Sequence, residues 1–226
     1  MDPGELEFIT QGAEAQLYMT IFLGFKSIVK YRVPKPYRHP DFDKLFRYRR
    51  TLIEARIMSH LKILGLNVPA IYFADPDHGL IIMEYIDGHR LSDCLSELSR
   101  DDIIRYALSL GRQTSIMHKN TIYHGDLTIA NTIIANDKLY IIDFGLAGYS
   151  RDLEEYAIDI HLLSRSIEAL YPELHDLFME YFWKGYMEIA GKEFTAKLKD
   201  KVRDIRLRGR YVEERLRRKI SRERYM

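Results

Sequence analysis

Two short polar motifs constrain this chain more than any other feature of its sequence. His124-Gly125-Asp126 is followed by Asn131, and Ile142-Asp143-Phe144-Gly145 places Asp143 twelve positions after Asn131. Asn136-Asp137 lies between the motifs at a predicted β-hairpin turn, and that hairpin would bring both motifs together. Carboxylate and amide oxygens are ligands that Mg²⁺ prefers. The spacing therefore predicts a metal site on Asn131 and Asp143, with Asp126 beside it as a proton acceptor.

The alternative interpretation is a polar hairpin in which these side chains only form turns, and for any single residue that is the more ordinary explanation. The full constellation, however, resembles the catalytic loop and the metal loop of protein kinases. The resemblance implies phosphoryl transfer from ATP. Asp143 and Asn131 would then hold Mg²⁺, and Asp126 would orient the attacking hydroxyl or accept its proton.

The kinase resemblance also calls for a lysine on the third strand and a glutamate on the following helix. Lys30 ends the apolar segment Ile28-Val29-Lys30, and Glu54 lies in the middle of a helix predicted over residues 44–64. Because burying an unpaired charge is costly, Lys30 needs an anionic partner. We expect Lys30 to pair with Glu54 and to reach the α- and β-phosphates of ATP.

Further contacts to the nucleotide are expected from a loop, an apolar pocket and the connection between two lobes. Gln11-Gly12-Ala13-Glu14-Ala15 stands where kinases have a glycine-rich phosphate loop, and only one glycine of that pattern remains. Backbone N–H groups of such a loop still face phosphates. The pocket and the connection are predicted from Ile28, Met83, Glu84, Ile86, Ile133 and Ile142.

The predicted elements form a strand-rich part followed by a helical part. Alternating apolar residues predict strands over residues 6–10, 15–23, 25–32, 70–74 and 80–85, and we expect Asp41 or Asp43 to cap the helix of residues 44–64. Helical spacing of apolar residues predicts helices over 100–118, 154–170 and 172–190. We therefore expect an α+β, bilobal protein-kinase-like fold, with a small β-rich N-lobe over residues 1–86 and a reduced helical C-lobe over residues 87–226.

Departures from ordinary protein kinases narrow the resemblance. Gly125 replaces the arginine that anchors a phosphorylated activation loop, and no A-P-E segment follows Gly145. With Lys35-Pro36-Tyr37-Arg38-His39-Pro40 and Arg206-Leu207-Arg208-Gly209-Arg210, nearly the whole chain resembles the small atypical kinase of the KEOPS complex, a relative of the RIO kinases. That family implies a serine/threonine kinase or ATPase that uses Mg·ATP. It also implies a role in making threonylcarbamoyladenosine in tRNA, beside a threonylcarbamoyltransferase subunit.

Two other classes of protein stay open at this point. Small-molecule phosphotransferases of the aminoglycoside or choline type share the H-G-D motif and the following metal aspartate. They usually have a larger helical C-lobe than the residues after Asp143 provide. A non-catalytic pseudokinase would have lost a catalytic group, whereas all five expected groups are present here.

The charge of the chain is unevenly distributed. Residues 197–226 contain 13 Lys/Arg and 5 Asp/Glu, a net +8, whereas the whole chain has a net charge of +1. Arg206, Arg208 and Arg210 alternate around Gly209, a spacing that does not favour a regular helix or i,i+4 pairs. We expect these arginines to be free for the phosphates of tRNA, and residues 215–224 to form a solvated helix face.

The remaining composition favours a soluble cytoplasmic protein. Cys94 is the single cysteine, so no disulfide can form within the chain. No apolar segment approaches the roughly 20 residues that a membrane span needs, and the acidic N-terminus lacks the pattern of a signal peptide.

Overall fold

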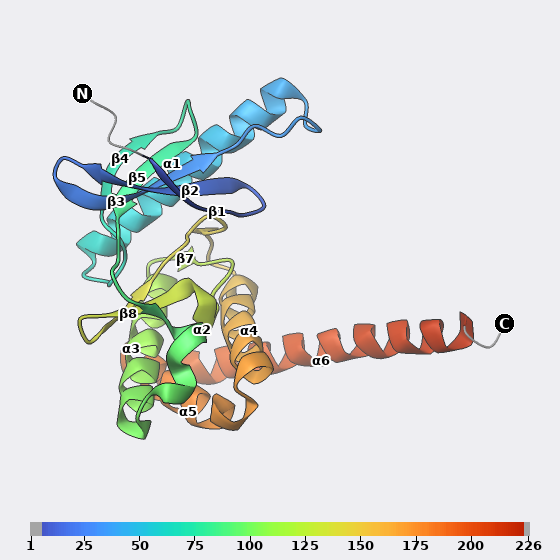
Figure 1. The fold of residues 1–226 in the computed structure, drawn as a ribbon. Coiled ribbons are helices and arrows are strands. Elements are labelled where there is room, and N and C mark those ends of the chain that lie inside the picture. The colour runs from blue at the N-terminus through green and yellow to red at the C-terminus, as the bar shows by residue number, and fades with distance from the viewer. Residues whose placement is uncertain (1–5, 224–226) are drawn as a thin grey trace. The chain divides into compact units, whose positions relative to one another are not determined.

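The computed structural model describes residues 6–223, and the side chains of residues 6–208 (Figure 1). Contacts group the chain into two compact units. The first consists of residues up to 98 together with 124–149, and the second of residues 99–123 together with those from 150 onward. Both polar motifs therefore belong to the first unit, with the sheet. The lobe boundary that the sequence predicts after residue 86 stays a prediction.

A five-stranded antiparallel sheet forms most of the first unit. Its strands are β1 (Glu7–Gln11), β2 (Ala15–Phe22), β3 (Phe25–Arg32), β4 (Ile71–Asp75) and β5 (Leu80–Glu84), in the spatial order β1-β2-β3-β5-β4. Leu23 and Gly24 turn β2 into β3, both with positive φ, as a two-residue hairpin requires. Strand β3 is central, and Lys30 pairs with Leu17 on one side and Ile81 on the other. The five predicted strands are confirmed within a residue or two at their ends.

Helix α1 (Pro40–Ile63) begins earlier than the sequence suggested. His39 is its N-cap residue and makes no side-chain capping bond, so the expected cap at Asp41 or Asp43 is wrong. Pro40 explains the early start, because its fixed φ and missing N–H suit the first turn of a helix. Asp43 instead lies buried and pairs with Arg47, Nε to Oδ2 at 2.8 Å.

The rest of the first unit carries the two polar motifs on a small sheet. Strands β6 (His89–Arg90), β8 (Thr132–Ala135) and β9 (Lys138–Ile141) pair in the order β6-β8-β9. Asn136 and Asp137 have φ of 48° and 59°, which confirms the predicted hairpin turn. Gly88 lets the chain pass close to β8, since a Cβ there would lie 2.1 Å from the carbonyl oxygen of Ile134. The short elements α2 (Leu91–Cys94), η1 (Leu95–Glu97), η2 (Ile129–Asn131) and β10 (Gly148–Tyr149) complete the unit.

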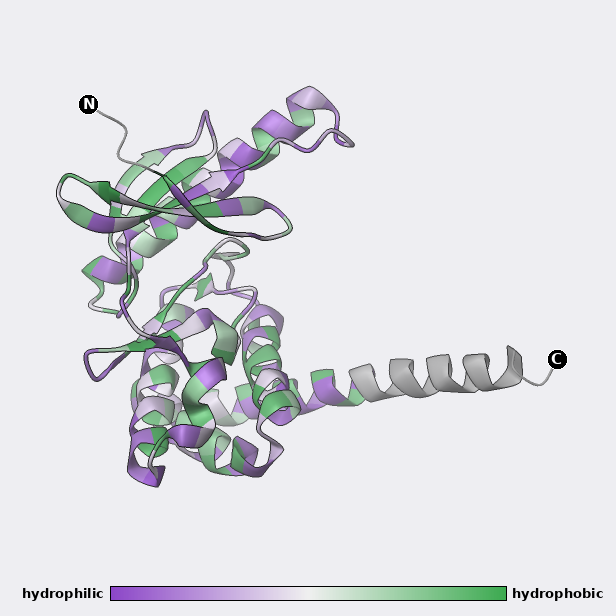
Figure 2. Cartoon of the chain, in the orientation of Figure 1, coloured by the Kyte–Doolittle hydropathy of each residue, from purple (hydrophilic) through white to green (hydrophobic). Residues whose placement is uncertain are grey.

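The second unit is helical, as predicted. It contains α3 (Arg100–Lys119), β7 (Ile122–Tyr123), α4 (Leu153–Leu170), α5 (Pro172–Ala190) and α6 (Lys192–Glu223). Helices α3 and α5 cross closely at two glycines. A Cβ on Gly111 would lie 2.0 Å from the carbonyl oxygen of Phe182, and one on Gly185 would lie 2.2 Å from that of Leu108. Figure 2 shows apolar and polar residues interleaved along α3, α4 and α5, the pattern of helices with one buried face.

The structure corrects the prediction for the basic segment. Residues around Gly209 lie inside the continuous helix α6, whereas the alternate arginines were expected to disfavour a helix. Arg206 Nη2 lies 2.7 Å from Glu168 Oε1, and Arg208 Nη2 lies 2.7 Å from Glu154 Oε1. The predicted free arginines are therefore paired at both positions, with carboxylates of α4 that are distant in sequence. The side chain of Arg210 and the predicted solvated face of residues 215–224 lie outside the described side chains. Across residues 6–223, no helix is both long and apolar enough to cross a bilayer.

Candidate active site

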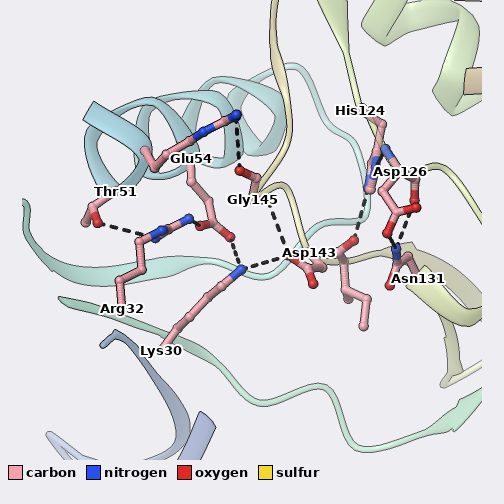
Figure 3. Close-up of polar contacts among 11 residues, drawn as sticks. Lys30, Arg32, Thr51, Glu54, His124, Asp126, Asn131, Asp143 and Gly145 are labelled. Carbon is pink, nitrogen blue, oxygen red and sulfur yellow. Dashed lines mark hydrogen bonds and ion pairs between the residues drawn. The ribbon is translucent and has the colours of Figure 1, made fainter. Parts of the chain in front are cut away.

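Lys30 lies at the centre of an ion-pair cluster in the first unit (Figure 3). Its Nζ atom is 2.7 Å from Oε1 of Glu54 and 2.7 Å from Oδ1 of Asp143. The predicted pair of Lys30 with Glu54 is confirmed, and Asp143 is an additional partner. One lysine thus joins β3, helix α1 and the second polar motif.

Electrostatics keep Lys30 and Asp143 ionised. Burial alone would lower the pKa of Lys30, but the carboxylates of Glu54 and Asp143 outweigh it and raise that pKa above its ordinary value of 10.5. Burial would likewise raise the pKa of Asp143. The charge of Lys30 and its hydrogen bond outweigh this effect and lower the pKa below the ordinary 3.8. Both groups are charged at neutral pH, and half of the Asp143 side chain is exposed to solvent.

Arg32 is a member of this cluster that the sequence analysis missed. Its Nη2 atom lies 2.5 Å from Oε2 of Glu54, and its Nη1 atom donates to Oγ1 of Thr51 at 3.3 Å. The signal was available, because residues two apart on a strand share a face and Arg32 follows Lys30 at that spacing. Glu54 therefore binds one cation with each carboxylate oxygen.

Asp126 and Asn131 contact each other within the first polar motif. Nδ2 of Asn131 donates to the backbone oxygen of Asp126 at 2.8 Å and to its Oδ2 at 2.9 Å. These two bonds fix the orientation of the amide, so its oxygen Oδ1 faces away from Asp126. That oxygen and the exposed carboxylate of Asp143 are the donor types that Mg²⁺ prefers.

His124 connects the two motifs. Its Nε2 lies 3.1 Å from the carbonyl oxygen of Ile142, and its Nδ1 accepts from the backbone N–H of Asp126 at 3.2 Å. This pattern requires the neutral tautomer with its proton on Nε2. The backbone N–H of Ile142 also donates to the backbone carbonyl oxygen of Asn131 at 3.0 Å. The metal residues predicted from the sequence, Asn131 and Asp143, are therefore held in one framework.

Backbone geometry at the motifs is special at two positions. Asp143 has a φ of 61°, which non-glycine residues seldom adopt and which is found at functional sites. Gly125 has a φ of 80°, and a Cβ there would lie 2.4 Å from the carbonyl oxygen of Leu146. The glycine that replaces the usual kinase arginine is thus required by the fold of this loop.

The predicted phosphate loop is a short turn in the sheet. Gln11 ends β1 and Ala15 begins β2, and the N–H of Gly12 donates to the oxygen of Ala15 at 2.9 Å. Ala13 is exposed, and the carboxylate of Glu14 accepts from Nη2 of Arg38 at 3.3 Å. The turn is therefore tied to the segment that leads into α1.

The predicted pocket residues lie in or directly after strands of the five-stranded sheet and of the small β6-β8-β9 sheet, both in the first unit. Ile28 pairs with Met83 across β3 and β5, Ile133 lies in β8, and Ile142 follows β9. The carboxylate and the N–H of Glu84 both have partners within the first unit. The carboxylate accepts from the N–H of Ala70 at 2.9 Å, and the N–H of Glu84 donates to the oxygen of Ala70 at 2.8 Å. Ile86 lies in the segment between β5 and β6. Among the described residues, no three or more histidine, cysteine or acidic side chains gather as a metal site.

Comparisons with known proteins agree with this geometry. The model of the protein kinase domain matches residues 20–161. The KEOPS complex subunit Bud32 of Pyrococcus abyssi is 39% identical over 92% of this chain and 97% of its own length. The chain belongs to the Bud32 family of protein kinase domains. The predicted resemblance and the predicted kinase fold are both confirmed.

Other members of the Bud32 family extend the match. The EKC/KEOPS complex subunit bud32 of Dictyostelium discoideum is 34% identical over 89% of this chain and 82% of its own length. A probable bifunctional tRNA threonylcarbamoyladenosine biosynthesis protein of Methanothermobacter thermautotrophicus is 33% identical over 92% of this chain, which covers 37% of that protein. Among solved structures, the Rio2 kinase-ADP/Mg²⁺-phosphoaspartate complex of Chaetomium thermophilum matches with a TM-score of 0.56 at 16% identity. That match covers 90% of this chain and 71% of the Rio2 chain, and it shows the fold alone.

Proposed function

We propose that this chain binds Mg·ATP and transfers or hydrolyses its γ-phosphoryl group, as an atypical serine/threonine kinase or an ATPase of the KEOPS complex. The contact of Lys30 with both Glu54 and Asp143, each at 2.7 Å, carries the proposal. Phosphoryl transfer by protein kinases requires a strand lysine paired with a helix glutamate, and a metal-binding aspartate in place.

The chain's own residues suit a nucleotide and a metal ion. Lys30 would hold the α- and β-phosphates, while Asp143 and the amide oxygen of Asn131 would bind Mg²⁺. Bound Mg²⁺ supplies positive charge against the phosphate oxygens. The fixed Asn131 amide and the ionised, half-exposed Asp143 carboxylate fit that role.

Asp126 is the proposed proton acceptor. As the attacking oxygen of a hydroxyl or water forms its bond to the γ-phosphorus, the bond to the β,γ-bridging oxygen of ADP breaks. The carboxylate of Asp126 receives the proton of the attacking group. Oδ2 of Asp126 already accepts from Asn131, so the carboxylate is held in place beside the proposed metal residue.

The remaining nucleotide contacts are proposed from residues in or next to the two sheets of the first unit. Ile28, Met83, Ile133 and Ile142 would contact the adenine ring, and the backbone near Ile86 would hydrogen-bond with its edge. Because the N–H of Glu84 donates to the oxygen of Ala70, a contact of Glu84 with the nucleotide would use its backbone oxygen and not its N–H. The turn from Gln11 to Ala15 would face the phosphates with its backbone.

Action on tRNA is proposed from the relatives. A bifunctional relative joins a region similar to this chain to further sequence and is named for tRNA threonylcarbamoyladenosine biosynthesis. This supports a threonylcarbamoyltransferase subunit as the partner of this chain. Hydrolysis is favoured over phosphorylation of many proteins, because only residues 146–152 separate Gly145 from α4 and leave little chain for a peptide-binding segment.

The deciding experiment measures ATP turnover by the purified protein. It is run alone, with total tRNA and with a candidate partner subunit, against an Asp126→Ala control. Turnover that depends on Asp126 and rises with tRNA and partner supports the proposal. Absence of turnover in all three mixtures contradicts it, and rapid phosphorylation of an aminoglycoside or choline would favour the small-molecule alternative.

A further inference from the structure

Glu54 of helix α1 binds two cations that both come from strand β3. Lys30 contacts Oε1 at 2.7 Å, and Arg32 contacts Oε2 at 2.5 Å (Figure 3). Lys30 and Arg32 are two positions apart, so both side chains leave β3 on the same face. Both carboxylate oxygens of Glu54 therefore bind cations that come from the same strand.

Arg32 also contacts α1 at a second position. Its guanidinium donates to Oγ1 of Thr51 at 3.3 Å, and Thr51 and Glu54 lie three residues apart, on one face of the helix. A single guanidinium thus spans about one turn of α1. A lysine ammonium lacks the planar fork with which one guanidinium reaches two acceptors through separate nitrogens.

Burial makes these contacts difficult to give up. Arg32 is 2% exposed and Glu54 is 1% exposed. If α1 moved away from β3, both charges would lose their partners in a site that water does not reach, and unpaired buried charges are strongly destabilising. In kinases that move this helix to control activity, the lysine–glutamate pair breaks and re-forms.

A third contact ties α1 to the second polar motif. Arg50, adjacent to Thr51, donates from Nη1 to the carbonyl oxygen of Gly145 at 3.4 Å. A Cβ placed on Gly145 would lie 3.3 Å from Nζ of Lys30 and 3.6 Å from Nη2 of Arg32. The Arg32 guanidinium therefore lies beside the glycine of the metal loop as well as beside Glu54.

We propose that Arg32 is a positioning residue that clamps Glu54 and α1 against Lys30, so that the active ion pair is formed without phosphorylation of the chain. The clamp rests on the proposed function for its effect on ATP turnover. Arg32 would do here what a phosphorylated activation loop does in regulated kinases. Those kinases anchor the phosphate with an arginine, and this chain has Gly125 at that position.

The test compares Arg32→Met and Arg32→Lys with Arg47→Met. Arg47 pairs with Asp43 on the same helix at 2.8 Å and its side chain is 14% exposed, so its loss removes a largely buried α1 ion pair without touching Glu54. Two measurements are made on the full chain. The first is kcat and KM for ATP, and the second is amide hydrogen exchange of residues 51–58 without nucleotide.

The clamp predicts a loss of about 10- to 100-fold in kcat/KM for Arg32→Met, since a displacement near 1 Å costs that much. Arg32→Lys should recover part of the loss, and Arg47→Met should stay within about twofold of the wild type. Exchange over residues 51–58 should accelerate in Arg32→Met and not in Arg47→Met. Because Arg32 acts through Glu54, adding Arg32→Met to Glu54→Gln should cost much less than it costs in the wild type.

The outcomes separate the clamp from the proposed function. Wild-type turnover and exchange in Arg32→Met, or additive losses with Glu54→Gln, would overturn the clamp and leave the proposed function standing. If the wild type neither binds nor turns over ATP, the proposed function fails, and the exchange of residues 51–58 still decides whether Arg32 holds α1. Arg32→Lys keeps the charge and supplies this comparison if Arg32→Met does not fold.

Discussion

Nε2 of His124 donates to the carbonyl oxygen of Ile142 at 3.1 Å, so one buried imidazole connects the loop of Asp126 to the loop of Asp143. Ile142 directly precedes Asp143, so this hydrogen bond holds the backbone from which the Asp143 carboxylate projects. The relative position of the proposed proton acceptor and the proposed metal residue therefore depends on a histidine that has neither of these proposed roles.

His124→Ala should reduce ATP turnover by about 10²-fold, because the two loops lose their fixed distance. The substitution also leaves the oxygen of Ile142 without this donor and creates a cavity, so the free energy of unfolding should fall. The measurement is steady-state turnover together with urea denaturation. His78→Ala, an exposed histidine that pairs with Asp75 in the turn before β5, serves as the matched control. Wild-type turnover in folded His124→Ala would contradict this role.

Asp143→Ala should abolish the use of Mg·ATP while the protein remains folded. Loss of one such electrostatic group typically costs about 10²–10³ in rate. The fold survives because half of the Asp143 side chain is exposed and the remaining partner of Lys30 is Glu54. Asp77→Ala removes an exposed carboxylate from the same unit and should leave the rate unchanged. Turnover equal to that of the wild type in folded Asp143→Ala would refute the assignment.

The pH dependence of stability should reveal the ionised pair of Lys30 and Asp143. A carboxyl group whose folded pKa is lowered stabilises the protein fully above its unfolded value, near 3.8, and loses that effect as pH falls through the folded pKa. Lys30 has a raised pKa, so its contribution is complete below 10.5 and is lost as pH rises through its folded value. The difference in free energy of unfolding between the wild type and Asp143→Asn should therefore be constant from about pH 5 to about pH 9. A difference that decays between pH 7 and pH 5 would show that Asp143 titrates with a raised pKa, against this prediction.

Activity should not require a phosphorylated activation loop. Gly125 replaces the arginine that would bind the phosphate, and Lys30 already contacts Glu54 in the chain without any modification. The protein is treated with a phosphatase, the phosphatase is removed, and ATP hydrolysis is measured again. We expect the rate to be retained, and complete loss of hydrolysis would contradict the prediction.

The basic C-terminal segment should still contribute to tRNA binding, although Arg206 and Arg208 are paired. Residues 209–226 alone contain seven Lys/Arg and three Asp/Glu. Deleting them should weaken tRNA binding with the partner present and make it less dependent on salt, because each neutralised phosphate releases counterions. Basal ATP binding should not change.

Two further variants test whether the paired arginines take part. Glu154→Gln and Glu168→Gln release Arg208 and Arg206, and tighter tRNA binding is expected if these arginines reach phosphates. If the truncated and full chains bind tRNA with equal affinity at every salt concentration, the proposal for this segment is contradicted. Glu180→Gln, which frees an exposed lysine of α5, is the matched control.

Much of the fold was predictable because its signals are local. The hairpin turns at Gly24 and at Asn136-Asp137, and the spacing of Asp126, Asn131 and Asp143, are written in short segments. The pair of Lys30 with Glu54 followed from the kinase resemblance, and the cost of burying an unpaired lysine supported it. The family resemblance then supplied the arrangement of these pieces, which short segments alone do not specify.

The error in the basic segment concerns contacts between residues far apart in sequence. The partners of Arg206 and Arg208 are Glu168 and Glu154 on another helix, so spacing within the basic segment could not reveal them. Arg32 was missed for a different reason. Its position two residues after Lys30 places it on the same face of the strand, but the kinase motif specifies one lysine there and no second cation. The cap of α1 was wrong because Pro40 starts the helix before either aspartate.

The contacts of α1 with β3 and with the loop of Asp143 have a consequence for control. An effector can only redistribute conformations that a protein already visits. A helix held at Arg50, Thr51 and Glu54 has little access to a second position. If Arg32 clamps α1 as proposed, a partner that stimulates this chain has no second arrangement of α1 to select. Its effect would have to appear in nucleotide exchange or in the placement of the attacking group. An effect on nucleotide exchange would leave the burst of the first turnover the same with and without the partner, whereas an effect on the attacking group would change that burst.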